Sequence, residues 1–81
     1  MKAYVLIETA AGKTKSVKKA LSTLKGGKTA VLSMDAVTGP YDFIVVLEGP
    51  SLDGIGQVVT EHIGVVDGVT RTTTCVAVAI S

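Results

Sequence analysis

The 81-residue chain has few of the residues on which catalytic and metal sites depend. It contains one cysteine, one histidine and no tryptophan, and its only aromatic residues are Tyr4, Tyr41 and Phe43. A single cysteine excludes an internal disulfide and any multi-cysteine metal site. Because Cys75 lies in an apolar, strand-like run, we expect it to be a small buried hydrophobic residue. We expect neither a metal nor a cofactor.

Long hydrophobic runs are also missing. No run approaches the roughly 18 residues of a membrane span. The apolar start at residues 3–7 is too short for a secretory signal, and Glu8 interrupts it. We therefore expect a soluble, cytoplasmic protein that does not contact a membrane.

The chain also lacks a strong charge of either sign. Its formal net charge is +1, so there is no global attraction to nucleic acid. Six lysines cluster in one segment: Lys13, Lys15, Lys18, Lys19, Lys25 and Lys28. No aromatic residue is interleaved for base stacking, which favours the solvated face of an amphipathic helix over a nucleic-acid site.

Aliphatic residues are abundant, since 47% of the chain is hydrophobic. The length predicts one domain over residues 1–81, near the lower limit for a self-sufficient core. So small a domain cannot hide this much apolar surface within itself. We therefore expect a homo-oligomer.

Hydrophobic periodicity and turn residues predict six elements. They are strands over residues 3–9, 29–37, 42–48 and 69–80, a helix from residue 13 to the Gly26-Gly27 pair, and a helix that begins after Ser51. In the second helix, apolar residues recur at helical spacing: Leu52, Ile55, Val59, Ile63 and Val66.

This β-α-β-β-α-β order predicts an α+β, ferredoxin-like fold, in which two helices cover one face of a four-stranded antiparallel sheet. The strands are apolar on both faces, as in the run Phe43 to Leu47. One set of these side chains remains on the face without helices. The pattern therefore predicts a dimer in which the sheets of two copies pack face to face.

Enzyme chemistry has little support in the sequence. His62 is the sole histidine, and the chain shows no nucleophile–histidine or metal-ligand spacing. The segment Gly26-Gly27-Lys28-Thr29 is similar to the end of a P-loop, but it follows a predicted helix and precedes a strand, which is the wrong order. Paired carboxylates for acid/base work would require sheet neighbours that the sequence does not define.

A binding site is better supported, at the turn Thr38-Gly39-Pro40-Tyr41-Asp42. Asp42 could accept a ligand ammonium group, and backbone N–H groups of the turn could hold a carboxylate. Thr72 and Thr74 point to one face of the last strand and add hydroxyls. If the two strand beginnings lie together, this set suits a zwitterion. A plain hairpin turn with ordinary strand threonines explains the same residues and is favoured on the residues alone.

The chain resembles the effector-binding (RAM) domain of the Lrp/AsnC family of transcriptional regulators. The resemblance covers the whole chain and depends on the segment Ala3 to Ile7, the helix entry from Gly12 to Val17, the Thr38–Asp42 turn, and Gly68-Val69 followed by Thr72 and Thr74.

The resemblance implies dimers that assemble into rings of four or five dimers, hence an octamer or decamer. It also implies an amino acid or similar small effector bound in clefts between neighbouring dimers. Gly39, Pro40, Tyr41 and Asp42 would form the turn side of a cleft, and Thr72 and Thr74 its hydroxyl side. Val58 and His62 match positions on the second helix that select the effector side chain.

Full-length members of the family also carry an N-terminal helix-turn-helix domain, whereas the first predicted strand here starts almost at Met1. We therefore expect a stand-alone effector domain that does not bind nucleic acid directly, modulates transcription and can co-assemble with full-length regulators.

Two alternatives remain open at this point. One is a small dimeric ferredoxin-like enzyme, of the cofactor-free monooxygenase or isomerase type, for which His62, Arg71 and Asp35 are the few available residues. The other is a purely structural assembly module with no ligand. We predict a ligand-binding protein that is not an enzyme.

Overall fold

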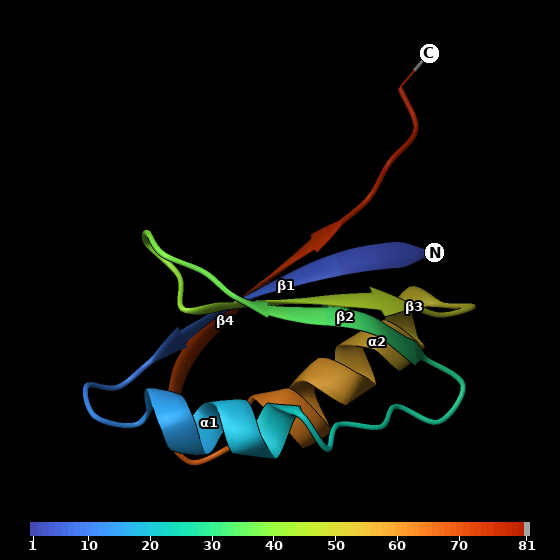
Figure 1. Ribbon diagram of the computed structural model, residues 1–81. Helices are drawn as coiled ribbons and strands as arrows, with labels where there is room; N and C mark the ends of the chain where they lie inside the picture. Colours follow the sequence, from blue (N-terminus) through green and yellow to red (C-terminus); the bar gives the residue numbers. More distant parts are fainter. Residues whose placement is uncertain (81) are drawn as a thin grey trace.

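A computed structural model of the chain describes residues 1–80. Its elements follow the predicted order (Figure 1). They are β1 (Lys2–Thr9), α1 (Thr14–Leu21), β2 (Ala30–Ala36), β3 (Phe43–Glu48), α2 (Leu52–Val58), its π-helical continuation η1 (Val59–Ile63), and β4 (Val69–Val76).

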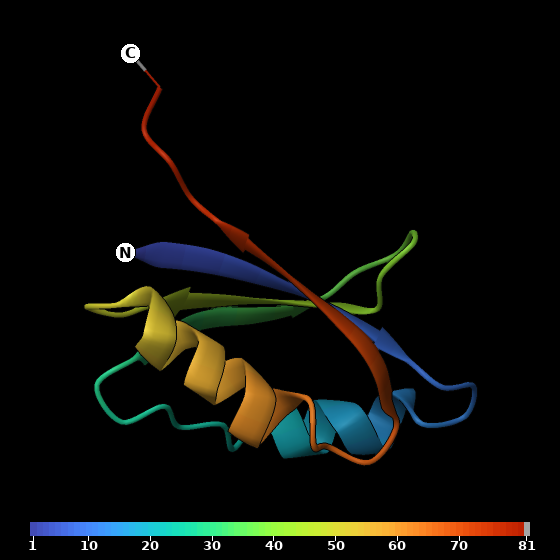
Figure 2. The same cartoon turned by 180° about the vertical axis from the view of Figure 1, so that it is seen from behind.

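The four strands form one antiparallel sheet in the order β2-β3-β1-β4. Both helices lie on the same side of this sheet, as the two opposite views show (Figures 1 and 2). The predicted α+β, ferredoxin-like fold is therefore confirmed. Because β1 is central, β3 and β4 each pair with it and not with one another.

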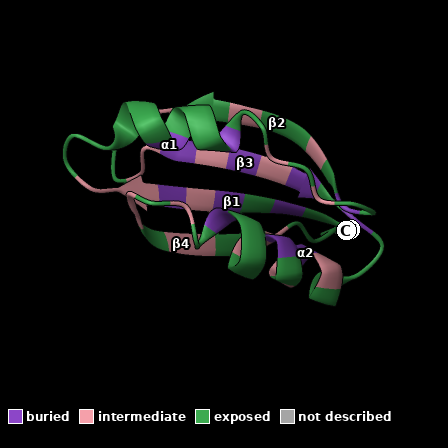
Figure 3. Cartoon of the chain, turned by 90° about the horizontal axis from the view of Figure 1, so that it is seen from below, coloured by how far each residue is buried: buried purple, intermediate pink, exposed green. Residues whose placement is uncertain are grey.

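The core lies between the sheet and the helices (Figure 3). Alternate residues of β1 and β3 point into it, because successive side chains of a strand face opposite sides of the sheet. The buried apolar residues are Ala3, Val5, Ile7, Val17, Leu21, Phe43, Val45, Leu47, Ile55, Val58 and Ile63.

The opposite face of the sheet carries no helix and is also apolar at its centre. Tyr4 pairs with Val46, and Leu6 pairs with Ile44, so all four side chains share this open face. Tyr4 is 37% exposed, and the other three are half-buried. The prediction of strands that are apolar on both faces is therefore confirmed for β1 and β3 but not for β4, whose predicted apolar residues 77–80 lie beyond the strand. Sheet-to-sheet packing of two copies stays a proposal.

The predicted first helix is longer than the observed one, which ends at Leu21. The hydroxyls of Ser22 and Thr23 donate to the carbonyl oxygens of Lys19 and Ala20, at 2.7 and 2.9 Å. These side chains satisfy carbonyls that another helical turn would otherwise have used. The helix therefore ends before the Gly26-Gly27 pair.

The predicted last strand is also too long, because β4 ends at Val76. The Ala77 N–H still donates to the Lys2 carbonyl at 2.8 Å, but β1 begins at Lys2 and offers no further partner. Residues 77–80 are exposed and extend away from the sheet (Figure 1).

Cys75 is a second correction on β4. It pairs with Tyr4 on the open face and is exposed in the chain, so it is not part of the core. A strand at the sheet edge shows one face to the helices and the other to the outside, and Cys75 has the outward position.

The predicted second helix is confirmed, but not all of its apolar positions are buried. Ile55 and Ile63 are fully buried, whereas Leu52 is 53% exposed. Val66 follows the helix and is half-buried. Within residues 1–80, no helix is long and apolar enough to cross a membrane.

Candidate functional site

The Thr38–Asp42 turn joins β2 to β3, as predicted for a hairpin. The Val37 N–H donates to the Asp42 carbonyl at 2.9 Å, and the Asp42 N–H donates to the Ile7 carbonyl at 2.8 Å. Gly39 has a φ of +127°, a conformation that favours glycine. Pro40 is exposed and Tyr41 is half-buried beside it.

Asp42 is held by the end of β1. Its Oδ2 accepts a hydrogen bond from the Thr9 N–H at 2.8 Å and another from the Thr9 hydroxyl at 3.0 Å. Its Oδ1 makes no hydrogen bond within residues 1–80. The turn therefore presents a half-buried carboxylate that is fixed through one oxygen and has the other free to accept a donor.

Thr72 and Thr74 lie on the helix side of the sheet. Thr72 is opposite Ile7 and Thr74 is opposite Val5, both of which point into the core. Thr74 lines a groove between β4 and α2, together with Ile55, Gly56 and other residues. The two hydroxyls therefore share one face, as predicted.

The turn and these threonines do not meet within one chain. Phe43, next to Asp42, and Thr72 are both opposite Ile7, but on different sides of β1. Two strand spacings, about 9–10 Å, separate such positions. The two strand beginnings are at the same end of the sheet with β1 between them.

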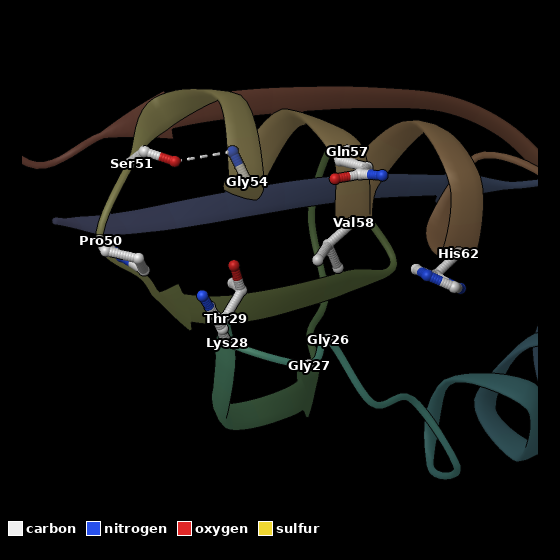
Figure 4. Close-up of a pocket in the computed structure, with 10 residues that line it drawn as sticks. All are labelled: Gly26, Gly27, Lys28, Thr29, Pro50, Ser51, Gly54, Gln57, Val58 and His62. Atoms are coloured by element: carbon white, nitrogen blue, oxygen red, sulfur yellow. Dashed lines mark hydrogen bonds between the residues drawn. The ribbon is translucent and has the colours of Figure 1, made fainter.

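Val58 and His62 lie elsewhere. Both line a cavity between α2 and the loop that precedes β2 (Figure 4). Val58 is 3% exposed, and His62 is on the surface. This cavity is at the β2 start, whereas the Thr38–Asp42 turn follows the β2 end. The eight predicted residues thus occupy separate places in a single chain.

Two further threonines lie at these sites and were not predicted as site residues: Thr9 at the turn and Thr29 in the cavity beside α2. Thr9 positions Asp42, and Thr29 is the one buried polar residue in the described part of the chain. Thr9 had no sequence signal, because its partner is 33 residues away. Thr29 follows the glycine pair that we considered as a P-loop end, and the structure confirms that this segment lies between a helix and a strand.

The residues that an enzyme would have used are scattered. Asp35 is on β2 and Arg71 on β4, which are the opposite edges of the sheet. His62 is on η1. Within residues 1–80, no group of three potential metal-ligating side chains occurs.

Comparison with known protein families gives one match over nearly the whole chain. The sequence model described as "Lrp/AsnC ligand binding domain" matches residues 2–80. A comparison with curated proteins gives no significant match.

Solved structures with the same fold include TTHA0845 from Thermus thermophilus, with a TM-score of 0.84 and 29% identity over 99% of this chain and 95% of that one. Escherichia coli AsnC has a TM-score of 0.83 and 20% identity, over 98% of this chain and 51% of AsnC. The transcriptional regulator NMB0573 of Neisseria meningitidis, solved as a complex with L-Met, has a TM-score of 0.77 and 16% identity, over 96% of this chain and 49% of the regulator.

The chain thus spans about half the length of the two regulators and nearly all of the Thermus protein. The two regulators support the fold, and the match over residues 2–80 gives the family. This chain belongs to the Lrp/AsnC ligand binding domain family.

Proposed function

We propose that this domain binds an amino acid or a related small metabolite, assembles through its open sheet face, and modulates transcriptional regulation in the cytoplasm. The observation that carries the proposal is the Asp42 carboxylate, which Thr9 holds through Oδ2 while Oδ1 remains free. A carboxylate that is already positioned suits an ammonium group, because charge-assisted hydrogen bonds are about twice as strong as neutral ones. The family match supports a ligand-binding role.

In this proposal, residues from two copies of the chain form the ligand site. Gly39, Pro40, Tyr41 and Asp42 supply the turn side, and Thr72 and Thr74 supply hydroxyls, but β1 separates the two sets within a chain. A cleft completed by a neighbouring copy would bring a turn and a pair of threonines to the same ligand. The Neisseria regulator, whose structure is described as a complex with L-Met, is a protein of this fold that binds an amino acid.

The assembly in the proposal is a dimer that packs sheet to sheet and then forms an octamer or decamer. The apolar open face around Tyr4, Leu6, Ile44 and Val46 supports the first step. Full-length regulators of the family are the proposed partners, because their effector domains would offer the same sheet face. That the domain is a stand-alone protein is a separate prediction. The intact mass of the protein isolated from its own cells tests it.

No enzymatic activity is proposed. The titratable residues that a ferredoxin-like enzyme would need are on opposite sheet edges and on η1, and do not converge on one cavity. This arrangement favours binding over the alternative of a cofactor-free monooxygenase or isomerase.

A thermal-shift screen of the free amino acids tests the proposed function. A ligand that binds only the folded state, at one hundred times its Kd, adds about 2.7 kcal/mol to the free energy of unfolding. We expect one or a few amino acids to raise the Tm, and Asp42→Asn to abolish that rise.

Asp67→Asn is the matched control, because Asp67 is exposed and pairs only with Lys13 at the surface. It should retain the ligand-dependent rise in Tm. The absence of any rise with all amino acids, or an unchanged rise in Asp42→Asn, would show that the turn is not a ligand site.

A further inference from the structure

A cavity lies at the opposite end of the β2–β3 hairpin from the turn. A cavity of about 360 Å³ opens between α2, the β3–α2 connection and the loop that precedes β2 (Figure 4). The residues that line it are Gly26, Gly27, Lys28, Thr29, Pro50, Ser51, Gly54, Gln57, Val58 and His62. The lengths of β2 and β3 place it about 20 Å from the Thr38–Asp42 turn.

The Thr29 hydroxyl is the central feature of this cavity. Thr29 is only 3% exposed, and its hydroxyl has no hydrogen-bond partner within residues 1–80. Among the described residues, every side-chain oxygen or nitrogen that is fully inaccessible has a hydrogen-bond partner. The unpaired Thr29 hydroxyl is therefore still accessible on one side. Figure 4 shows Thr29 pointing toward α2 across the cavity.

Two glycines, Gly49 and Gly54, lie close to the Thr29 hydroxyl. A Cβ atom added at Gly49 would be 2.8 Å from the Thr29 Oγ1, and one added at Gly54 would be 3.4 Å from it. The chain thus makes close contact around this hydroxyl without giving it a partner. Because the hydroxyl has an open side and no partner among the described residues, it can donate a hydrogen bond to a group that enters the cavity.

The charge of the lining indicates the class of ligand. Lys28 and His62 are its ionisable side chains, and no Asp or Glu lines the cavity. Both are exposed, at the mouth of the cavity. A positive rim favours an anion, and without a carboxylate the cavity offers an ammonium group no charged partner. The zwitterion proposed for the Asp42 turn therefore does not fit here.

The remaining walls fit a carbon skeleton with a carboxylate. Val58 and Pro50 are apolar, while Ser51 accepts the Gly54 N–H at 3.1 Å and keeps its own hydroxyl hydrogen available. The Gln57 amide adds further donors. We propose that this cavity binds a small organic carboxylate that carries no ammonium group, with Thr29 as the buried hydrogen-bond donor and Lys28 as the cation at the rim.

Succinate is the probe, and the methyl NMR signals of Val58 report its binding in the assembled protein. We expect a saturable shift of these signals with succinate. Thr29→Val keeps the shape of the side chain and should weaken binding at least about tenfold, the usual effect of losing a hydrogen bond to a charged group. Thr60→Val, an exposed position on η1 outside the cavity, should leave the affinity within about twofold.

Lys28→Gln provides a second variant, since Lys28 is exposed and its replacement does not disturb the core. It should weaken succinate binding and reduce the dependence of binding on salt concentration. Asp42→Asn should leave succinate binding unchanged, because the turn is a separate site. Failure of the amino-acid screen would therefore not affect this result.

Three outcomes would overturn the proposal. The first is a Val58 signal that succinate does not shift. The second is a cavity that binds inorganic phosphate but not succinate, which would assign it to phosphate. The third is loss of succinate binding in Asp42→Asn, which would place the succinate at the turn.

Discussion

Gly68 lies at a tight contact, where the loop after η1 passes close to α1. Its φ is +99°, and a Cβ atom there would be 2.7 Å from the Lys13 Cβ and 2.9 Å from a Val17 methyl. Gly56 differs from it in both respects, because it is inside α2 and has open space around it. The same substitution should therefore have opposite effects at the two positions.

Gly68→Ala should lower the free energy of unfolding by at least about 2 kcal/mol, through backbone strain and the clash with α1. Gly56→Ala should raise it by up to about 1 kcal/mol, because alanine favours a helix over glycine. Urea unfolding of both variants measures the two effects. An unchanged free energy of unfolding in Gly68→Ala would show that the loop tolerates a side chain at residue 68.

Asp42 illustrates what could be predicted about a residue from the sequence. Its place at the end of a glycine turn suggested that the Asp42 carboxylate could accept a ligand ammonium group. The structure shows that Thr9 binds one oxygen of this carboxylate and that the other is free within residues 1–80. Its partner Thr9 could not be predicted, because only the pairing of β1 with β3 brings them together. The assignment of Asp42 to a ligand stays a prediction.

Among the elements, α2 and η1 form one continuous helix with a π-helical end. The buried positions are Ile55, Val58 and Ile63. Val59, four residues before Ile63, is half-buried and packs against the same core, so Ile63 keeps helical spacing to a core neighbour. The Gly64 N–H donates to the Val59 carbonyl at 2.7 Å, which is the π spacing.

The start of α2 depends on its cap. The Ser51 hydroxyl accepts the Gly54 N–H at 3.1 Å, in a helix that two glycines weaken. Ser51→Ala should lower the free energy of unfolding by about 1 kcal/mol, and Ser51→Asn should restore most of it. Thermal unfolding of the two variants measures the difference. Equal stability of both variants and the parent would show that the cap contributes nothing.

At the scale of the whole molecule, the sheet has a covered face and an open one. The helices bury the alternate residues of β1 and β3, while Tyr4, Leu6, Ile44 and Val46 form an apolar strip on the other side. An apolar strip at the centre of a sheet is typical of a surface that another protein covers. A second copy of the chain presents a matching strip.

Val46→Lys tests this assembly. A charge at the centre of a packed sheet interface would be buried without a partner, so we expect the oligomer to dissociate toward the 8.3 kDa chain. Light scattering after size-exclusion chromatography measures the mass. Lys15→Ala on the exposed side of α1 is the control and should retain the parent mass. An unchanged mass in Val46→Lys would exclude the open face as the interface.

Local patterns in the sequence predict the type and order of the elements, because alternation, helical spacing and glycine turns act over a few residues. The same patterns predict that β3 is apolar on both faces. Three features depend on contacts between distant segments: β1 lies between β3 and β4, Cys75 faces outward, and Thr29 opens into a cavity beside α2. The side-chain period assigns a residue to a face, but its neighbours come from contacts between segments far apart in the chain.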